Sequence, residues 1–266
     1  MGWWIVAGFV GFGVGAALVA LLRTRLPKRD ALPWAPPQYE VMRGLAHEIR
    51  NPLNAMSVTV QLLEEDLKEG GLDREELKAQ LGLIRNEAER LESVLSDFQR
   101  YARIIMRAEA ADIGQLIHDT LDFMTPTAEQ NGIEIVREIE PLPIMAADPK
   151  LLQQAFLNVI LNAFQAMQDG GELKVEARQD GSESPLTAQV LFSDTGPGIA
   201  AEAEGRVFEP FFSTKPGGTG LGMSVARQAV ELHGGSVEAG DRPGGGGAQV
   251  VFRWPIRVVK TMNGER

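Results

Sequence analysis

Apolar residues at alternating spacings of four and three constrain this chain more than any other feature of its sequence. The longer run consists of Leu77, Leu81, Ile84, Ala88, Leu91, Leu95, Phe98, Ala102 and Ile105. A shorter run in the same register comes before it and consists of Met42, Leu45, Ile49, Met56, Thr59 and Leu63. Such seams are typical of helices packed in a coiled coil or bundle. They predict two helices that form a hairpin, because Gly70-Gly71 separates them.

A lone hairpin buries only part of such a seam. Pairing two hairpins in a dimeric four-helix bundle would bury the rest, and the sequence therefore favours a homodimer. The alternative is a hairpin that packs on the C-terminal domain of its own chain.

The segment Trp3–Leu22 carries no charge, and Arg23, Arg25, Lys28 and Arg29 follow it directly. A helix of this length spans the hydrocarbon core of a bilayer, which is roughly 30 Å thick, and basic flanks stay in the cytoplasm. We expect a single membrane helix at 3–22 and a Pro-rich cytoplasmic linker at 23–37. A cleaved signal peptide would need basic residues before the apolar run, and Met1-Gly2 supplies none. With two residues ahead of the span, we expect no sensor domain outside the membrane.

The pattern changes after residue 111, where helical and strand periods alternate. Three helices are expected, at Ile113–Ala128, Asp148–Met167 and Leu221–His233. Five strands are expected, at Ile133–Ile139, Leu173–Ala177, Ala188–Ser193, Ser236–Ala239 and Gln249–Trp254. This order predicts helices layered on a largely antiparallel or mixed sheet.

Composition excludes several classes of function. Twenty-six basic and 36 acidic side chains give a net charge of −10, which argues against nucleic-acid binding through phosphate contacts. The chain has no cysteine, so it has no disulfide, thiolate zinc site or cysteine nucleophile. With three histidines, a multi-histidine metal centre is not expected.

Three glycine-containing stretches follow one another in the last domain. They are Asp194-Thr-Gly-Pro-Gly-Ile199, Phe208-Glu-Pro-Phe-Phe-Ser-Thr-Lys215 and Gly217-Gly-Thr-Gly-Leu-Gly222. The third leads into an expected helix, whose N-terminus favours negative charge, so it suits a phosphate. It is neither a Walker A loop nor a dinucleotide fingerprint, because no Gly-Lys-Ser/Thr follows and Met223 stands where the last glycine would be. Any one stretch alone could be an ordinary turn.

Polar residues near these stretches complete a candidate site. Asn158 and Asn162 lie four apart on one helix face, and the amide oxygen of Asn162 suits Mg²⁺. Asp194 follows an apolar strand and can accept a hydrogen bond from an exocyclic amine. Lys215 is expected to meet a terminal phosphate, with a solvated surface lysine as the alternative.

These motifs resemble the N, G1, F and G2 boxes of sensor histidine kinases. The resemblance implies the Bergerat-type α/β sandwich shared with the gyrase, Hsp90 and MutL ATPases, with a mixed sheet and helices on one face. It implies ATP with Mg²⁺, with Asp194 on the adenine amine, Asn162 on the metal and a mobile lid between Ile199 and Gly217. The residues that the resemblance and the pattern assign to nucleotide binding are Asn158, Asn162, Asp194, Gly196, Gly198, Lys215, Gly218, Thr219, Gly220, Leu221 and Gly222.

The first predicted helix carries Leu45-Ala-His47-Glu48-Ile-Arg-Asn51-Pro52-Leu-Asn54, which is similar to the H box of the same family. If Leu45 is a seam position, His47 faces outward, where it has no packing role. A neutral imidazole is a nucleophile, and Glu48 beside it can orient or deprotonate the ring. The family pattern gives Glu48 the base role and gives Asn51 the positioning of water when a partner protein is dephosphorylated. His118 and His233 are expected to be structural.

The whole pattern is therefore identified as a dimeric sensor histidine kinase of a two-component system. The resemblance implies a dimerisation and phosphotransfer domain at 38–107 (HisKA), a catalytic ATP-binding domain at 108–257 and a tail at 258–266. It also implies the bacterial inner membrane as location, a cytoplasmic catalytic part and a response regulator that receives the phosphoryl group. The run FEPFFSTKPGGTGLG is most similar to the nitrogen-regulator subgroup, whose regulators often work with the sigma-54 factor.

Two other classes of function stay open from the sequence. One is an ATP-driven conformational machine without phosphotransfer, against which the H box counts. The other is a signalling scaffold or a protein dominated by phosphatase activity, whose hairpin only binds a regulator. The sequence does not decide between phosphorylation within one subunit and across the dimer, which depends on the hairpin turn.

Overall fold

The structure is a computed structural model that describes residues 37–69, 73–102, 105–181, 186–215 and 218–257. The expected membrane helix at 3–22, the linker up to residue 36, Gly70-Gly71 and the tail at 258–266 lie outside the described residues. Within the described ranges, no helix is both long enough and apolar enough to cross a membrane.

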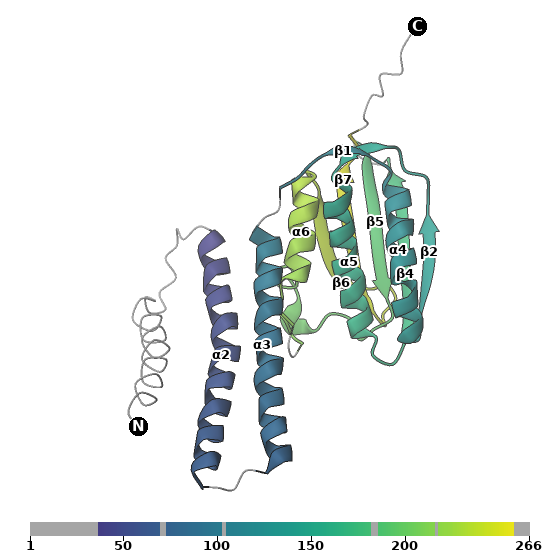
Figure 1. The fold of residues 1–266 in the computed structure, drawn as a ribbon. Helices are drawn as coiled ribbons and strands as arrows, with labels where there is room; N and C mark the ends of the chain where they lie inside the picture. Colours follow the sequence, from purple (N-terminus) through teal and green to yellow (C-terminus); the bar gives the residue numbers. More distant parts are fainter. Residues whose placement is uncertain (1–36, 70–72, 103–104, 182–185, 216–217, 258–266) are drawn as a thin grey trace. The chain divides into compact units, whose positions relative to one another are not determined.

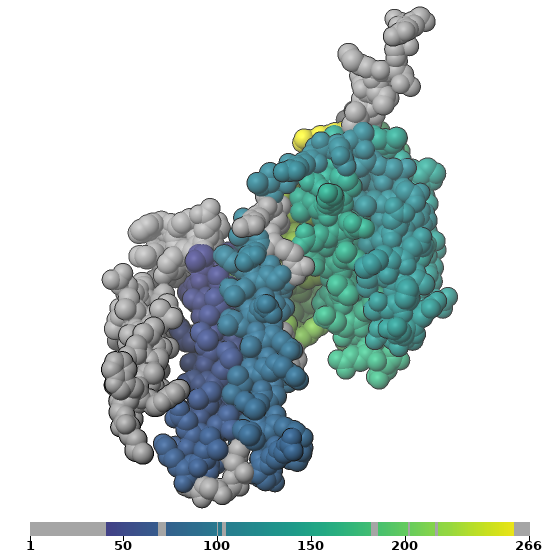
Figure 2. Space-filling model, viewed as in Figure 1, coloured from purple at the N-terminus to yellow at the C-terminus, as the bar shows by residue number. Residues whose placement is uncertain are grey.

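Two long antiparallel helices form the hairpin that the seams predict. They are α2 (Pro37–Glu69) and α3 (Arg74–Ala102), and they lie side by side in the ribbon and the space-filling views (Figures 1 and 2). The amide Nε2 of Gln80 in α3 donates to Asp66 Oδ2 in α2 at 3.0 Å. Asp73 caps α3, because its Oδ1 accepts from the backbone N–H groups of Glu75 and Glu76, at 2.7 and 2.8 Å.

Within the hairpin, only alternate residues of the α3 seam are covered. Leu77, Ile84 and Leu91 of α3 are partly covered. The alternate seam residues stay exposed, with Leu81 at 52% and Leu95 at 40%. Alternate burial of this kind leaves an apolar stripe on the hairpin, and a second pair of helices is the structure that normally covers such a stripe.

The C-terminal part is a five-stranded mixed sheet with helices on one face. The strand order is β2-β4-β5-β7-β6, in which β2 pairs with β4 in parallel and the other pairs are antiparallel. The strands are β2 Ile133–Ile139, β4 Gly171–Asp180, β5 Thr187–Asp194, β6 Ser236–Asp241 and β7 Ala248–Pro255. The helices are α4 Ile113–Gln130, α5 Pro149–Ala166 and α6 Gly222–Leu232. The predicted mixed sheet and the three predicted helices are confirmed.

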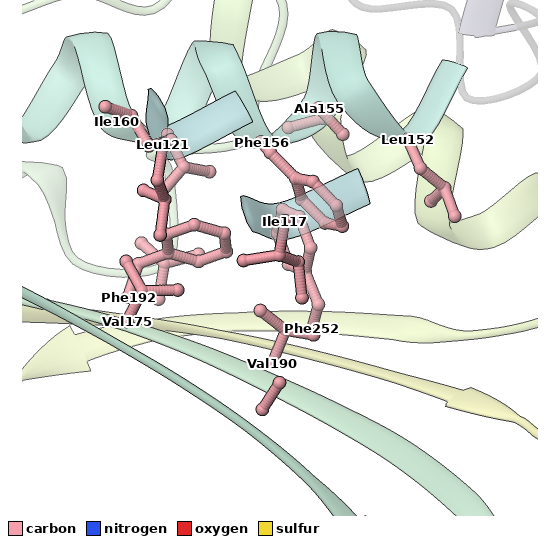
Figure 3. Packing of buried hydrophobic residues seen from close by; sticks show 14 of the residues in the cluster. Ile117, Leu121, Leu152, Ala155, Phe156, Ile160, Val175, Val190, Phe192 and Phe252 are labelled. Carbon is pink, nitrogen blue, oxygen red and sulfur yellow. The ribbon is translucent and has the colours of Figure 1, made fainter. Parts of the chain in front are cut away.

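The core lies between these helices and the sheet. Figure 3 shows side chains of α4 and α5 meeting those of β4, β5 and β7. Phe156 of α5, Phe192 of β5 and Phe252 of β7 form an aromatic cluster with ring centroids 5.6 to 6.1 Å apart. This packing fixes α5 and the end of β5 relative to each other, and both carry residues of the candidate site.

A small second sheet was not predicted. β1 (Glu109–Ala111) pairs antiparallel with β3 (Met145–Ala147), and Asp148 follows β3 directly. Asp148 caps α5, because its Oδ1 accepts from Leu151 N at 3.1 Å and its Oδ2 from Arg107 N at 2.7 Å. These three-residue strands carry too short a pattern to be read from sequence.

His233 joins this cap to the end of α6. Its side chain is buried, its Nδ1 lies 2.7 Å from the carbonyl of Ala229, and its Nε2 accepts from Asp148 N at 2.9 Å. His233 therefore has the structural role expected of it, because its ring links the end of α6 to the start of α5.

We expect Asp148→Ala to lower the free energy of unfolding by about 1–2 kcal/mol, since it removes the cap of α5. Burial raises the pKa of Asp148, but the backbone N–H groups of Arg107, Leu151 and Lys150 lower it more, and the net pKa is below its usual value. The carboxylate therefore stabilises the fold above about pH 4, and its contribution is lost as pH falls through the lowered pKa. Urea unfolding followed by circular dichroism should give the wild type and Asp148→Ala the same free energy of unfolding at acid pH. A difference that grows on acidification would contradict the assignment.

Candidate functional site

One face of α5 carries the polar groups of the site. Asn158, Asn162 and Gln165 follow one another at spacings of four and three, so they share a face of the helix. The opposite face carries Phe156, Val159 and Ile160, which are buried in the core. Hydrophobic packing of one face therefore holds the amide side chains of the other in place.

Lys215 reaches α5 from the segment that follows β5. Its Nζ donates to Asn162 Oδ1 at 2.7 Å, to the main-chain oxygen of Asn162 at 3.2 Å and to Gln165 Oε1 at 3.2 Å. Burial lowers the pKa of Lys215, and the negative charge of Asp194 opposes this. Three oxygens of α5 thus hold the ammonium that is expected to meet a terminal phosphate, and the phosphate contact stays a prediction. Gln165 was missed, although its place one turn after Asn162 could have pointed to it.

Asp194 ends the central strand β5 and is 8% exposed. Its Oδ1 accepts from the backbone N–H groups of Gly196 and Ala248, at 2.9 and 3.1 Å. Among the described residues, Oδ2 has no hydrogen-bond partner and can accept from a ligand. This is the geometry expected of an acceptor for an exocyclic amine.

Two glycines allow the backbone to pass close to the main chain of Asp194 and to Asp241, which lies beside the turn after Asp194. Gly247 has φ +141°, and a Cβ there would collide with the main-chain oxygen of Asp194. Gly198 has φ +84°, and a Cβ there would lie 2.9 Å from Asp241 Oδ1, which accepts from Ile199 N. Gly196 and Gly198 thus shape the turn after Asp194. Asp241 and Gly247 support it, and neither was singled out in the sequence.

The loop 218–222 leads into α6, and the first turn of that helix has no side-chain cap. Gly220 has φ +66°, and a Cβ there would come within 2.6 Å of the backbone of Phe211 and Phe212. Thr219 donates its hydroxyl to Asp97 Oδ2 at 2.7 Å, and Leu221 is buried. Free N–H groups at a helix start, together with the positive end of its dipole, favour an anion.

Asn158 gives an independent sign of a ligand at this helix start. Its Nδ2 is buried and has no hydrogen-bond partner among the described residues, and its Oδ1 would lie 3.6 Å from a Cβ at Gly222. A buried amide donor without a partner costs free energy. A phosphate oxygen beside the first turn of α6 would satisfy it.

The described residues contain no cluster of histidine, cysteine or acidic side chains that could hold a metal ion. The oxygens of Asn162 and Gln165 already surround a cation, the ammonium of Lys215. Amide oxygens are hard ligands, and Mg²⁺ in nucleotide sites takes few protein ligands because phosphates and waters supply the others. The donor set therefore fits a phosphate-bound Mg²⁺ on Asn162.

The second group of functional residues lies on α2. His47 is 69% exposed at its side chain, which agrees with the outward position expected from the seam. Its Nδ1 lies 3.4 Å from the amide nitrogen of Asn51 and 3.8 Å from Glu48 Oε1. The other oxygen of Glu48 lies 3.8 Å from the guanidinium of Arg90 in α3, a neighbour that the sequence did not reveal. Both polar neighbours on α2 lie on the Nδ1 side, so Nε2 is left for a reacting group.

Two family models match the chain. Residues 38–107 match the His Kinase A (phospho-acceptor) domain, and residues 147–258 match the histidine kinase-, DNA gyrase B- and HSP90-like ATPase. The first match covers the hairpin with His47, and the second covers α5, Asp194 and the loop 218–222.

Curated relatives are similar to most of this chain. The sensor histidine kinase ZraS of Escherichia coli (strain K12) is 35% identical over 219 residues, which are 82% of this chain and 45% of ZraS. The sensory histidine kinase/phosphatase NtrB of Salmonella typhimurium is 31% identical over 77% of this chain and 59% of NtrB. The chain thus spans about half the length of the curated relatives it matches.

Solved structures agree with this similarity. Histidine kinase ThkA in complex with response regulator protein TrrA has a TM-score of 0.62 at 25% identity, covering 82% of this chain and 61% of ThkA. Full-length ShkA in complex with AMPPNP has a TM-score of 0.56 at 30% identity, covering 85% of this chain and 47% of ShkA.

Proposed function

The chain belongs to the sensor histidine kinases of two-component systems, and we propose that it transfers the γ-phosphoryl group of ATP to His47. The observation that carries the proposal is the exposed imidazole of His47, with the carboxylate of Glu48 and the amide of Asn51 both near its Nδ1. An exposed ring with one free nitrogen can approach a phosphate held by a separate domain. A structural histidine would be buried, as His233 is.

The proposed reaction uses the two ring nitrogens differently. Nε2 attacks the γ-phosphorus, the Nε2–P bond forms, and the bond from phosphorus to the β,γ-bridging oxygen breaks, which releases ADP. The reacting ring is the tautomer with its proton on Nδ1, in which the amide nitrogen of Asn51 no longer donates to Nδ1. That proton passes to Glu48, whose Oε1 lies 3.8 Å from Nδ1 and whose other oxygen faces Arg90. Alignment and charge neutralisation supply most of the rate in phosphoryl transfer.

Nucleotide binding is assigned to the ATP-binding domain. Asp194 Oδ2 accepts from the adenine amine, and the start of α6 with Asn158 receives the phosphates. Asn162 would hold Mg²⁺, which neutralises charge that develops on the phosphates. The glycines at 218, 220 and 222 let the backbone approach the phosphate oxygens.

The working molecule is proposed to be a homodimer. The exposed half of the α3 seam, including Leu81 and Leu95, would be covered by the hairpin of a second chain. Four-helix packing of this kind leaves His47 on the outside, where a response regulator can dock on the hairpin.

The proposed partner is a response regulator, which receives the phosphoryl group from His47 on an aspartate. Asn51 would position water for the reverse task of dephosphorylating that regulator. The similarity to NtrB, which is named a kinase/phosphatase, supports this second activity. The run FEPFFSTKPGGTGLG supports a regulator of the sigma-54 enhancer-binding type.

Membrane anchoring is part of the proposal. It rests on the uncharged segment Trp3–Leu22 with four basic residues after it. The proposed location is therefore the inner membrane, with the hairpin and the ATP-binding domain in the cytoplasm.

Autophosphorylation of the full chain with γ-labelled ATP and Mg²⁺ tests the proposal. We expect protein-bound label that is lost in acid and kept in alkali, as a phosphoramidate is. Steady ADP release without bound label would favour the ATP-driven machine. ATP binding with neither label nor ADP release, together with Asn51-dependent dephosphorylation of a regulator, would favour the phosphatase.

A further inference from the structure

The ammonium of Lys215 contacts Asn162 Oδ1, the oxygen that is expected to bind the metal. Three acceptors from two residues of α5 surround Nζ, and the shortest contact, 2.7 Å, is to the side-chain oxygen of Asn162. Gln165 Oε1 and the main-chain oxygen of Asn162 complete the set at 3.2 Å each. Three hydrogen bonds therefore hold this partly buried ammonium against α5.

We propose that Lys215 is an internal cation that competes with the metal for Asn162, and that this competition makes the site select nucleoside triphosphates over diphosphates. The inference rests on the proposed function, because it requires that Asn162 takes the metal of a bound nucleotide.

The displacement follows from the geometry of one amide oxygen. Mg²⁺ binds oxygen at about 2.0–2.1 Å, so a metal on Asn162 Oδ1 would lie about 4 Å from an ammonium that kept its contact with the same atom. Two cations at that distance in a partly buried site repel strongly. Lys215 must therefore leave Asn162 when a metal-bound nucleotide enters.

The released ammonium needs a new acceptor. The β-phosphate of either nucleotide is proposed to lie at the start of α6, where it accepts hydrogen bonds from backbone N–H groups and from Asn158. A γ-phosphate adds negative charge and further acceptor oxygens, and the long, flexible side chain of Lys215 can reach them. A metal-bound diphosphate removes the ammonium of Lys215 from Asn162 and offers it no new acceptor. A metal-bound triphosphate also removes it, but its γ-phosphate then accepts from the ammonium.

The backbone near Lys215 allows such a change of partner. The hydroxyl of Ser213 accepts from Lys215 N at 3.1 Å, and Gly218 N donates to the main-chain oxygen of Lys215 at 3.3 Å. These bonds use only main-chain atoms of Lys215. The side chain can swing from α5 to a phosphate while the turn that carries it stays formed.

Calorimetric titration of the full chain with Mg²⁺–ADP and with the Mg²⁺ complex of the non-hydrolysable analogue AMPPNP tests the proposal. In Lys215→Met we expect Mg²⁺–ADP to bind about three- to tenfold tighter and Mg²⁺–AMPPNP about three- to tenfold weaker. The preference for the triphosphate should fall by about tenfold or more. In EDTA, where no metal displaces the ammonium, the tightening for ADP should disappear.

Lys150→Met is the matched control, because Lys150 is an exposed lysine on the same helix. It should leave both affinities unchanged. Equal weakening of both nucleotides by Lys215→Met would make Lys215 a plain phosphate contact, and no change would make it a surface lysine. Either result overturns the inference. Failure of the wild-type chain to bind any nucleotide would instead overturn the proposed function.

Gln165→Leu separates the contact with α5 from the contact with phosphate. It removes one oxygen from Lys215 and leaves both Asn162 and the lysine. We expect Mg²⁺–ADP to bind about two- to threefold tighter and Mg²⁺–AMPPNP not to weaken. In the nucleotide-free chain, backbone amides at 206–215 should exchange hydrogen faster in both variants than in the wild type. Weaker ADP binding in Gln165→Leu, or unchanged exchange in both variants, would contradict the competition.

Discussion

Replacing His47 with Gln should abolish acid-labile phosphate incorporation and leave ATP affinity within about twofold of the wild type. Gln keeps a polar side chain of similar reach on α2 but has no nitrogen that can attack phosphorus. The side chain at this position is 69% exposed, so the substitution should change the free energy of unfolding by no more than about 0.5 kcal/mol. The measurement is label incorporation beside ATP titration on the same preparation.

His118→Gln is the control for this substitution, since His118 lies on α4, which carries none of the proposed site residues. It should keep its label. Residual label in His47→Gln would place the phosphoacceptor at another side chain. Loss of ATP binding in that variant would mean that His47 has a structural role.

Replacing Asp194 with Asn should weaken ATP binding by on the order of 100-fold, through a reversal of hydrogen-bond polarity. Two backbone N–H groups, of Gly196 and Ala248, point at Oδ1 and will hold the amide oxygen of Asn in that place. The amide NH₂ then occupies the position of Oδ2 and faces the donor amine of adenine. Two donors that face each other cannot form a hydrogen bond, and both are desolvated.

Nucleotide titration checks this prediction, with ADP and GDP compared. The variant should lose most of the preference for adenine, because the carboxylate oxygen that receives the amine is gone. Asp119→Asn is the matched control, an exposed aspartate of α4 that should leave affinity unchanged. An Asp194→Asn variant that binds ATP normally would remove Asp194 from the adenine site.

Much of the fold follows from local pattern. The seam spacing predicted α2 and α3, and the strand expected at 133–139 has the bounds of β2. Amphipathic periods act over a few neighbouring residues, so a single sequence records them. The strands β1 and β3 have three residues each and exist because they pair with each other, which no local pattern records.

The candidate site divides in the same way. Asp194, Asn162 and the glycines at 218–222 stand in motifs whose residue types suggest their chemistry. Arg90 beside Glu48 and Gly247 against Asp194 are joined across long stretches of chain. Packing brings these residues together, and their spacing in the sequence does not predict these contacts.

The sequence by itself determined the long helices, the strands of the five-stranded sheet and which residue types gather in motifs, because helix and strand periods, caps and glycine turns depend on near neighbours. The tertiary structure decided what those residues touch. It placed the ammonium of Lys215 on Asn162 and Gln165, and it made His233 a link between α5 and α6. Such contacts depend on how the core sets the distance between elements far apart in the chain, and that distance is a property of the packed fold.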